Sequence, residues 1–284
     1  MSTSKAKRNH YNPKDYLRHF ADPSNPQKLH LFDKQSGKWI FTNISNAGVW
    51  TGFYRDEDEK WLSDKVEFPA GPALAKLRAG QPIDSDERSQ VALYVESMIK
   101  RVPSTRREFL RGATSALAEL RESSEELSLK LGTTPHVVLR ALDYLEEEQT
   151  TNPLSMTSEV ARYQWTNQEV IDVLLAMNWT VLIAHGSDTF LTGDNPAFLP
   201  RKDGLQAPES QLAFPLSSRA ALVADRRKSR VALVDHTKAT SAQVKEINRR
   251  MILASDRFIY SHRELPWVKD VLSNPVRPWK RILN

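Results

Sequence analysis

The stretch Trp179-Thr180-Val181-Leu182-Ile183-Ala184 marks the return of a two-residue hydrophobic period after a long helical block. Because a period of two is typical of a strand, this change decides the fold class. Gly186-Ser187-Asp188 predicts a turn directly after the strand, and Thr189 to Thr192 predicts its hairpin partner. Towards the C-terminus, apolar patterning predicts further strands and one helix, the strands at 213–216, 220–224, 231–234 and 257–262 and the helix at 241–254.

Towards the N-terminus, the same strand is preceded by apolar residues at helical spacing over residues 59–178. The first helix of this block is expected to be interrupted by Pro69 and Pro72. Before the block, alternating apolar residues in 28–54 flank Ser36-Gly37 and predict a β-hairpin. Strands, then helices, then strands with one helix indicate an α+β fold.

The pattern predicts a single domain over 1–284, because no internal repeat or low-complexity linker divides the chain. We expect a mixed or antiparallel sheet built from the N- and C-terminal segments. Residues 59–178 would then form a helical insertion or layer between the two halves of that sheet. A chain of 284 residues is long enough to bury a sizeable core.

Composition restricts the class of protein. The chain is 40% apolar and 26% charged, which is typical of a globular protein, and no apolar run has the length of a membrane helix. The absence of cysteine excludes disulfides, thiol catalysis and Cys-ligated zinc. The polar, basic residues 1–9 lack the apolar core of a secretory signal. A bacterial, cytoplasmic protein is therefore expected.

The net charge of +5 comes from basic clusters that alternate with acidic runs at 56–59 and 146–148. If the basic clusters share a face, they would bind the phosphates of RNA or DNA. The arginines that we expect to do so are Arg106, Arg107, Arg111, Arg226 and Arg227. The alternatives are a protein partner or solvated helix ends and loops, since charge runs commonly lie on solvated surfaces.

Two segments place polar side chains beside aromatic residues and prolines. They are His10-Tyr11-Asn12-Pro13-Lys14-Asp15-Tyr16-Leu17-Arg18-His19-Phe20 and Phe190-Leu191-Thr192-Gly193-Asp194-Asn195-Pro196. Both resemble segments of a widespread bacterial family, domain of unknown function 4238. Further similar landmarks run along almost the whole chain, among them Arg101-x-Pro103, Phe214-Pro215-Leu216-Ser217 and Ala254-x-Asp256-Arg257. The resemblance supports one domain and implies no established activity.

Two positions depart from the family pattern. Gly193 stands where the family usually has serine, which suggests that no hydroxyl is needed there. Lys14-Asp15 stands where an apolar or aromatic residue is commoner.

The polar residues of the two segments suggest hydrolytic chemistry. Asp194 follows a predicted strand, where rigid backbone can hold a carboxylate towards a cleft, and His10 could be a metal ligand or a general base. Glu67 or Glu59 would supply a second carboxylate. One histidine and two carboxylates suit a divalent metal ion that hydrolyses a phosphodiester or an amide.

A structural interpretation of the same residues stays open. Asp194-Asn195-Pro196 after a strand is also a turn sequence, in which Asp or Asn caps backbone N–H groups. His10 could equally belong to a packed entry into the fold. Arg18 and Arg101 could hold an anionic substrate, or one of them could pair with the Asp194 carboxylate.

Candidate substrate-binding residues are Arg18, Arg101, Asn195, Tyr11 and Tyr16. Two functions from different classes remain. The first is a metal-dependent nuclease or related phosphoesterase that uses His10, Asp194 and Glu67. The second is a non-enzymatic module that binds nucleic acid or a protein. Either is compatible with a toxin or a phage-defence effector.

Overall fold

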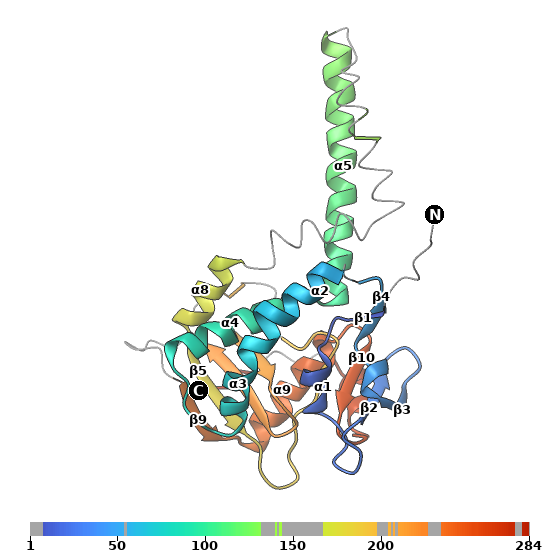
Figure 1. The fold of residues 1–284 in the computed structure, drawn as a ribbon. Helices are drawn as coiled ribbons and strands as arrows, with labels where there is room; N and C mark the ends of the chain where they lie inside the picture. The colour runs from blue at the N-terminus through green and yellow to red at the C-terminus, as the bar shows by residue number, and fades with distance from the viewer. Residues whose placement is uncertain are drawn as a thin grey trace.

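In this computed structural model, two sheets and a layer of helices form a body from which one long helix projects (Figure 1). The described part of the chain comprises residues 8–53, 56–131, 140, 142–143, 167–197, 204–205, 207, 210–226, 234–275 and 280–283. The architecture confirms the expected α+β class.

The first sheet joins the two ends of the chain. Its four strands are antiparallel in the order β3-β2-β10-β6. Their bounds are β2 Lys28–Asp33, β3 Lys38–Asn43, β6 Thr192–Gly193 and β10 Phe258–Ser261. The predicted hairpin is confirmed as β2 and β3, and a C-terminal strand pairs directly with it. A separate two-stranded sheet pairs β1 (Arg8–His10) with β4 (Val49–Thr51).

The second sheet lies wholly in the C-terminal half and has the order β7-β8-β5-β9. Its strands are β5 Asn178–Ile183, β7 Gln211–Pro215, β8 Ala220–Asp225 and β9 Val234–Lys238. Only the β5–β9 pair is parallel. The predicted hairpin between β5 and Thr189–Thr192 is therefore wrong, because β5 pairs with β8 and β9, and β6 pairs with β10.

The helical layer begins with α2 (Asp56–Leu62), a π-helical turn (Ser63–Glu67) and α3 (Phe68–Arg78), which follow one another without a loop. The expected interruption therefore takes the form of a π-turn immediately before α3. Both prolines lie within this continuous helical run, Pro69 just after the π-turn and Pro72 inside α3. The layer continues with α4 (Ser85–Lys100), whose N-terminus carries a capping box of Asp84 and Glu87.

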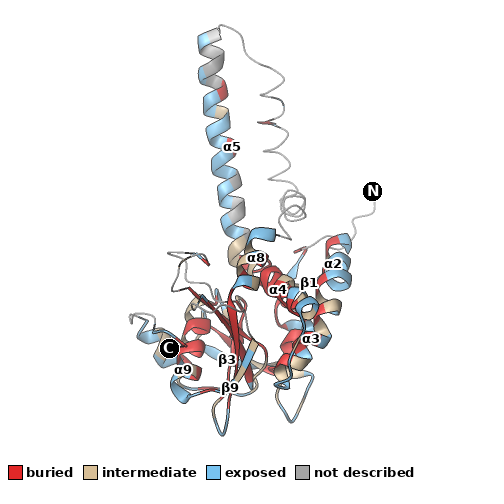
Figure 2. Cartoon of the chain, turned by 90° about the vertical axis from the view of Figure 1, so that its left-hand side faces the viewer, coloured by how far each residue is buried: buried red, intermediate tan, exposed pale blue. Residues whose placement is uncertain are grey.

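The projecting helix is α5 (Pro103–Leu131), which extends well beyond the body in Figures 1 and 2. Most of its described side chains are exposed, and Leu120 is 57% exposed. The other helices in the described part of the chain are α1 (Lys14–Arg18), the 3-10 turn Ile44–Asn46, α8 (Gln168–Ala176), α9 (Ser241–Ala254) and α10 (Val268–Ser273). Among the helices that the structure describes, none combines the length and apolarity needed to span a membrane.

Buried side chains form two clusters around the sheets (red in Figure 2). The larger cluster packs the N-terminal aromatics Tyr11, Tyr16 and Phe20 against the helical layer and the inner face of the second sheet. The smaller cluster lies under α9 and α10. The N-terminal segment is thus part of the core, which explains its aromatic content.

Candidate functional site

The two polar segments of the sequence meet through direct hydrogen bonds. The Tyr16 hydroxyl lies 2.7 Å from Thr192 Oγ1 and donates to the Pro215 carbonyl at 2.8 Å. The Asn12 side-chain amide donates to the Gly193 carbonyl at 2.8 Å. The two segments therefore act together as a connection between α1 and the first sheet.

Asp194 is held by backbone donors. Its carboxylate accepts the N–H groups of Asp256 at 2.7 Å, Arg257 at 2.7 Å and Phe258 at 2.8 Å, and the residue is 1% exposed. Burial raises its pKa above the usual value for an aspartate, and the three backbone hydrogen bonds act in the opposite direction. The carboxylate thus caps the turn at 256–258, as the structural interpretation of the sequence predicts.

The turn that Asp194 caps also contacts Asn195, β2 and α5. The Asn195 side-chain amide donates to the Ala254 carbonyl at 3.3 Å, rather than facing a cleft. The Arg257 guanidinium donates two hydrogen bonds of 3.0 Å to Asp33 on β2. Asp256 forms an ion pair with Arg107 at the base of α5. We call residues 254–258 the hub loop, because it joins β6, β2 and α5.

Gly193 has a steric role next to this loop. A Cβ atom at this position would lie 1.8 Å from Ser255 Oγ and 3.0 Å from the Phe258 carbonyl oxygen. Its backbone therefore approaches the hub loop too closely for a side chain. This explains, with Ser255 in its present position, why glycine replaces the serine that is usual in the resembled family.

The two candidate tyrosines are internal. Tyr11 is 2% exposed and its hydroxyl lies 3.3 Å from that of Tyr260, and Tyr16 is 4% exposed. Burial raises the pKa of both phenols well above their usual value. Both side chains stabilise the fold, and neither lines a described cavity.

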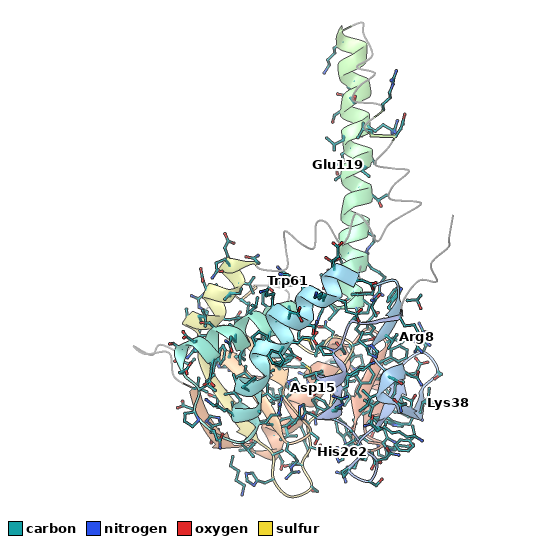
Figure 3. The ribbon with its side chains drawn as sticks, in the orientation of Figure 1. Arg8, Asp15, Lys38, Trp61, Glu119 and His262 are labelled. Atoms are coloured by element: carbon teal, nitrogen blue, oxygen red, sulfur yellow. The ribbon has the colours of Figure 1, made fainter. Side chains whose placement is uncertain are left out.

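A polar cavity of about 550 Å³ opens between α1 and α2, which we call the α1–α2 cavity. Figure 3 shows Asp15 on α1 and Trp61 on α2, the two helices that flank it. Its charged lining comprises Lys14, Arg18, Lys60 and Arg101 and the carboxylates Asp15, Asp56, Glu59 and Glu67. His10 also lines it, so the cavity unites four residues expected from the sequence: His10, Glu67, Arg18 and Arg101.

His10 is the titratable group of this cavity whose environment favours base chemistry. Burial lowers its pKa, and the positive charge of Lys14 lowers it further, while a backbone hydrogen bond with Ser45 and the charge of Glu59 act in the opposite direction. The imidazole is therefore neutral near pH 7. Its Nε2 is buried and has no hydrogen-bond partner among the residues that the structure describes.

The other expected residues of the cavity are paired. Arg101 Nη1 donates to Glu67 Oε1 at 2.7 Å, with the arginine side chain 1% exposed and the glutamate 31% exposed. The Arg18 guanidinium lies 3.4 Å from Asp15 at the exposed rim. Arg101 therefore holds Glu67, and neither arginine pairs with Asp194 in the described structure.

The expected metal site does not fit the described residues. Asp194 does not line the α1–α2 cavity, and its oxygens already accept three backbone donors. Within the described ranges, no group of three or more His, Asp or Glu side chains is arranged to hold a metal ion. His10 and Glu67 line the cavity without Asp194, so these three residues do not form one metal site in the described structure.

The arginines expected to bind nucleic acid are spread over separate elements. Arg107 pairs with Asp256 and is 46% exposed, whereas Arg111 is exposed on α5 and Arg226 is exposed after β8. The Arg106 side chain and Arg227 lie outside what the structure describes.

The sequence did not single out Lys60 and Ser63, which complete the cavity wall. The sequence does show which lining residues share a helix face. Lys14 and Arg18 have helical i, i+4 spacing, as do Asp56 and Lys60, so each pair projects from one face of its helix. What the sequence lacks is any sign that these two helices face each other.

The family model described as "Protein of unknown function (DUF4238)" matches residues 8–264, nearly the whole chain. Neither the curated proteins nor the solved structures contain a match.

Proposed function

The chain belongs to the family described as "Protein of unknown function (DUF4238)", and we propose, from the residues of the α1–α2 cavity, that it is a hydrolase of phosphodiester bonds whose site is this cavity. The observation that carries the proposal is His10, a neutral imidazole in a charged cavity with no hydrogen-bond partner for Nε2 among the described residues. A neutral imidazole near pH 7 is suited to general-base catalysis.

The charges of the cavity support a phosphate-containing substrate. Lys14 and Lys60 are exposed on the two helices that flank the cavity, and neither forms an ion pair with a described carboxylate. Both are thus available to a phosphate, whereas Arg18 and Arg101 already contact Asp15 and Glu67. The lysines would hold the substrate across the cavity.

In the proposed reaction, His10 accepts a proton from a water molecule as the water oxygen attacks phosphorus. The bond between phosphorus and the leaving oxygen breaks, and the imidazolium returns the proton to that oxygen. The products are a phosphomonoester and an alcohol. Since Nε2 is buried, neighbouring side chains must turn aside before a substrate in the cavity can reach it.

The test is hydrolysis of bis(p-nitrophenyl) phosphate by the full chain and by His10→Gln. We expect the substitution to lower kcat/KM by about 100-fold or more, the usual contribution of a general base. His236→Gln is the matched control, because burial also lowers the pKa of His236, which lies on β9 outside the cavity. Equal activity of the two variants would reject His10 as the base.

A second candidate is a non-enzymatic module that binds nucleic acid or a protein. It is favoured by the structural roles of Asp194, Tyr11 and Tyr16, and by exposed Arg111 on the projecting α5. Its test is binding of a labelled single-stranded RNA, measured by fluorescence anisotropy. Binding without hydrolysis would select this candidate, and either activity would suit a toxin or phage-defence effector.

A further inference from the structure

A second cavity, of about 410 Å³, lies between α9, α10 and the turn at 187–189. We call it the α9–α10 cavity. It borders Arg263, which directly follows His262, and Figure 3 shows His262 at the end of the body opposite α5. This volume falls in the range of pockets that bind small organic molecules.

The walls of this cavity are largely apolar. Val244 of α9, Val271 of α10 and Leu265 and Trp267 between the helices contribute to the lining. Trp267 is half-buried and adds a flat aromatic surface. An apolar, planar group would therefore gain hydrophobic burial here.

The polar floor does not offer free hydrogen-bonding groups. The Asn248 side chain donates to the Thr189 carbonyl at 2.8 Å and accepts the Leu191 N–H at 3.0 Å. The Thr189 hydroxyl lies 3.0 Å from the Ser218 carbonyl and 3.2 Å from His262 Nδ1. Since these floor groups already make hydrogen bonds within the protein, a polar group of a ligand would have to bind to residues at the rim.

The rim carries cations that no described carboxylate neutralises. Lys245 and Arg263 are exposed and form no ion pair with a described residue, although Arg263 donates to the Ser187 carbonyl at 3.0 Å. Arg249 also lines the cavity but shares Glu246 with Arg250. Two carboxylates also line the cavity, Asp188, which accepts the Ser241 hydroxyl at 2.6 Å, and Asp270 on α10.

We propose that the α9–α10 cavity is a binding site for a small amphipathic anion, with a planar apolar body against Val271 and Trp267 and an acidic group at Lys245 and Arg263. The site is separate from the α1–α2 cavity, and no residue lines both. Its occupation does not depend on phosphodiester hydrolysis.

The test uses two fluorescent naphthalene compounds with the full chain. The anion is 1-anilinonaphthalene-8-sulfonate, and the neutral analogue is N-phenyl-1-naphthylamine. We expect saturable binding of one anion per chain. Lys245→Gln should weaken the anion about five-fold, the effect of roughly 1 kcal/mol from a partly exposed charge, and change the neutral compound less than about two-fold. Lys269→Gln, on α10 but outside the lining, should change neither.

Two further variants test the location. Val271→Trp should fill the cavity and abolish binding of both compounds. Asn274→Trp, at the exposed rim, narrows the entrance without changing the core and should weaken both, so the test survives if Val271→Trp does not fold. Binding that neither variant weakens, or an equal response of both compounds to Lys245→Gln, would overturn the proposal. Lack of saturable binding by the folded wild-type chain would do the same.

Discussion

Asp194 and Arg257 are joined by a hydrogen bond in the hub loop, and Arg257 in turn joins this loop to β2. The Asp194 carboxylate accepts the Arg257 backbone N–H at 2.7 Å, and the Arg257 side chain makes two hydrogen bonds of 3.0 Å to Asp33 on β2. The backbone of Arg257 is thus fixed from β6 while its side chain fixes β2. The hub loop consequently connects two strands of the first sheet.

Asp194→Asn should lower the free energy of unfolding by roughly 2–3 kcal/mol, because an uncharged amide offers one acceptor oxygen to three buried N–H donors. Urea denaturation measures the loss. Asp15→Asn, at an exposed position on α1, should change stability by less than about 0.5 kcal/mol. An Asp194→Asn variant with wild-type stability and no activity would instead support a catalytic carboxylate.

Gly193→Ala should destabilise the chain by about 1–3 kcal/mol, since the new Cβ would lie 1.8 Å from Ser255 Oγ. Ser255→Ala removes that oxygen, so the double variant should recover part of the loss. A thermal-melt double-mutant cycle with a coupling of about 1 kcal/mol or more is expected. Strictly additive effects would show that the two positions do not compete for this space.

Tyr16→Phe should cost about 1–2 kcal/mol, because the buried Thr192 hydroxyl and Pro215 carbonyl both lose a partner. Tyr11→Phe is the matched change in the same cluster. It should cost less, because the Tyr11 hydroxyl makes a single longer contact of 3.3 Å with Tyr260, which also accepts the Gly48 N–H. The prediction is contradicted if chemical denaturation gives the reverse order.

The pH dependence of phosphodiester hydrolysis should follow His10. Because only the neutral imidazole accepts a proton, kcat/KM should be constant near neutral pH and fall as the pH drops through a midpoint below 6.5. Lys14→Gln removes a charge that lowers the pKa of His10, so the midpoint should rise. Glu59→Gln should move it down. If neither substitution moved the midpoint of the kcat/KM profile, the titration would belong to another group.

Arg111 should contribute to nucleic-acid binding more than Arg107, because Arg107 is already paired with Asp256. Arg111→Gln should make the log–log salt slope for single-stranded RNA shallower by about 0.7, the value for one phosphate contact. Arg107→Gln should change the slope less. Affinity that is insensitive to salt in the wild-type chain would leave these arginines as ordinary surface charges.

Local patterns predicted the elements whose residues are close in sequence. The β2–β3 hairpin was indicated by alternation around Ser36-Gly37, and α9 by its helical spacing over 241–254, the bounds that the structure gives. The predicted partner of β6 was wrong, because alternation of apolar residues indicates a strand but not the strand with which it pairs. β6 has β10 beside it, and that strand belongs to a distant part of the chain.

The candidate site shows the same limit in chemical terms. The sequence marked His10, Glu67, Arg18 and Arg101, which the α1–α2 cavity brings together. It also marked Asp194, whose residue type suits a metal ligand and a backbone cap equally. Only the positions of the three N–H donors in the hub loop distinguish these roles, and these donors lie 62 to 64 positions from Asp194 in the sequence.

The pairing of β2 with β10 has a consequence for the nascent chain on the ribosome. Asp33 and its partner Arg257 are 224 positions apart, so β2 cannot pair with β10 until nearly the whole protein has been synthesised. At bacterial and eukaryotic elongation rates this wait is roughly 10–45 s, during which one edge of the β2–β3 hairpin is unpaired. A strand edge exposed for that time is a substrate for holding chaperones and a starting point for aggregation. We therefore expect the yield of soluble protein to rise when holding chaperones are co-expressed, even if the folded protein itself is stable.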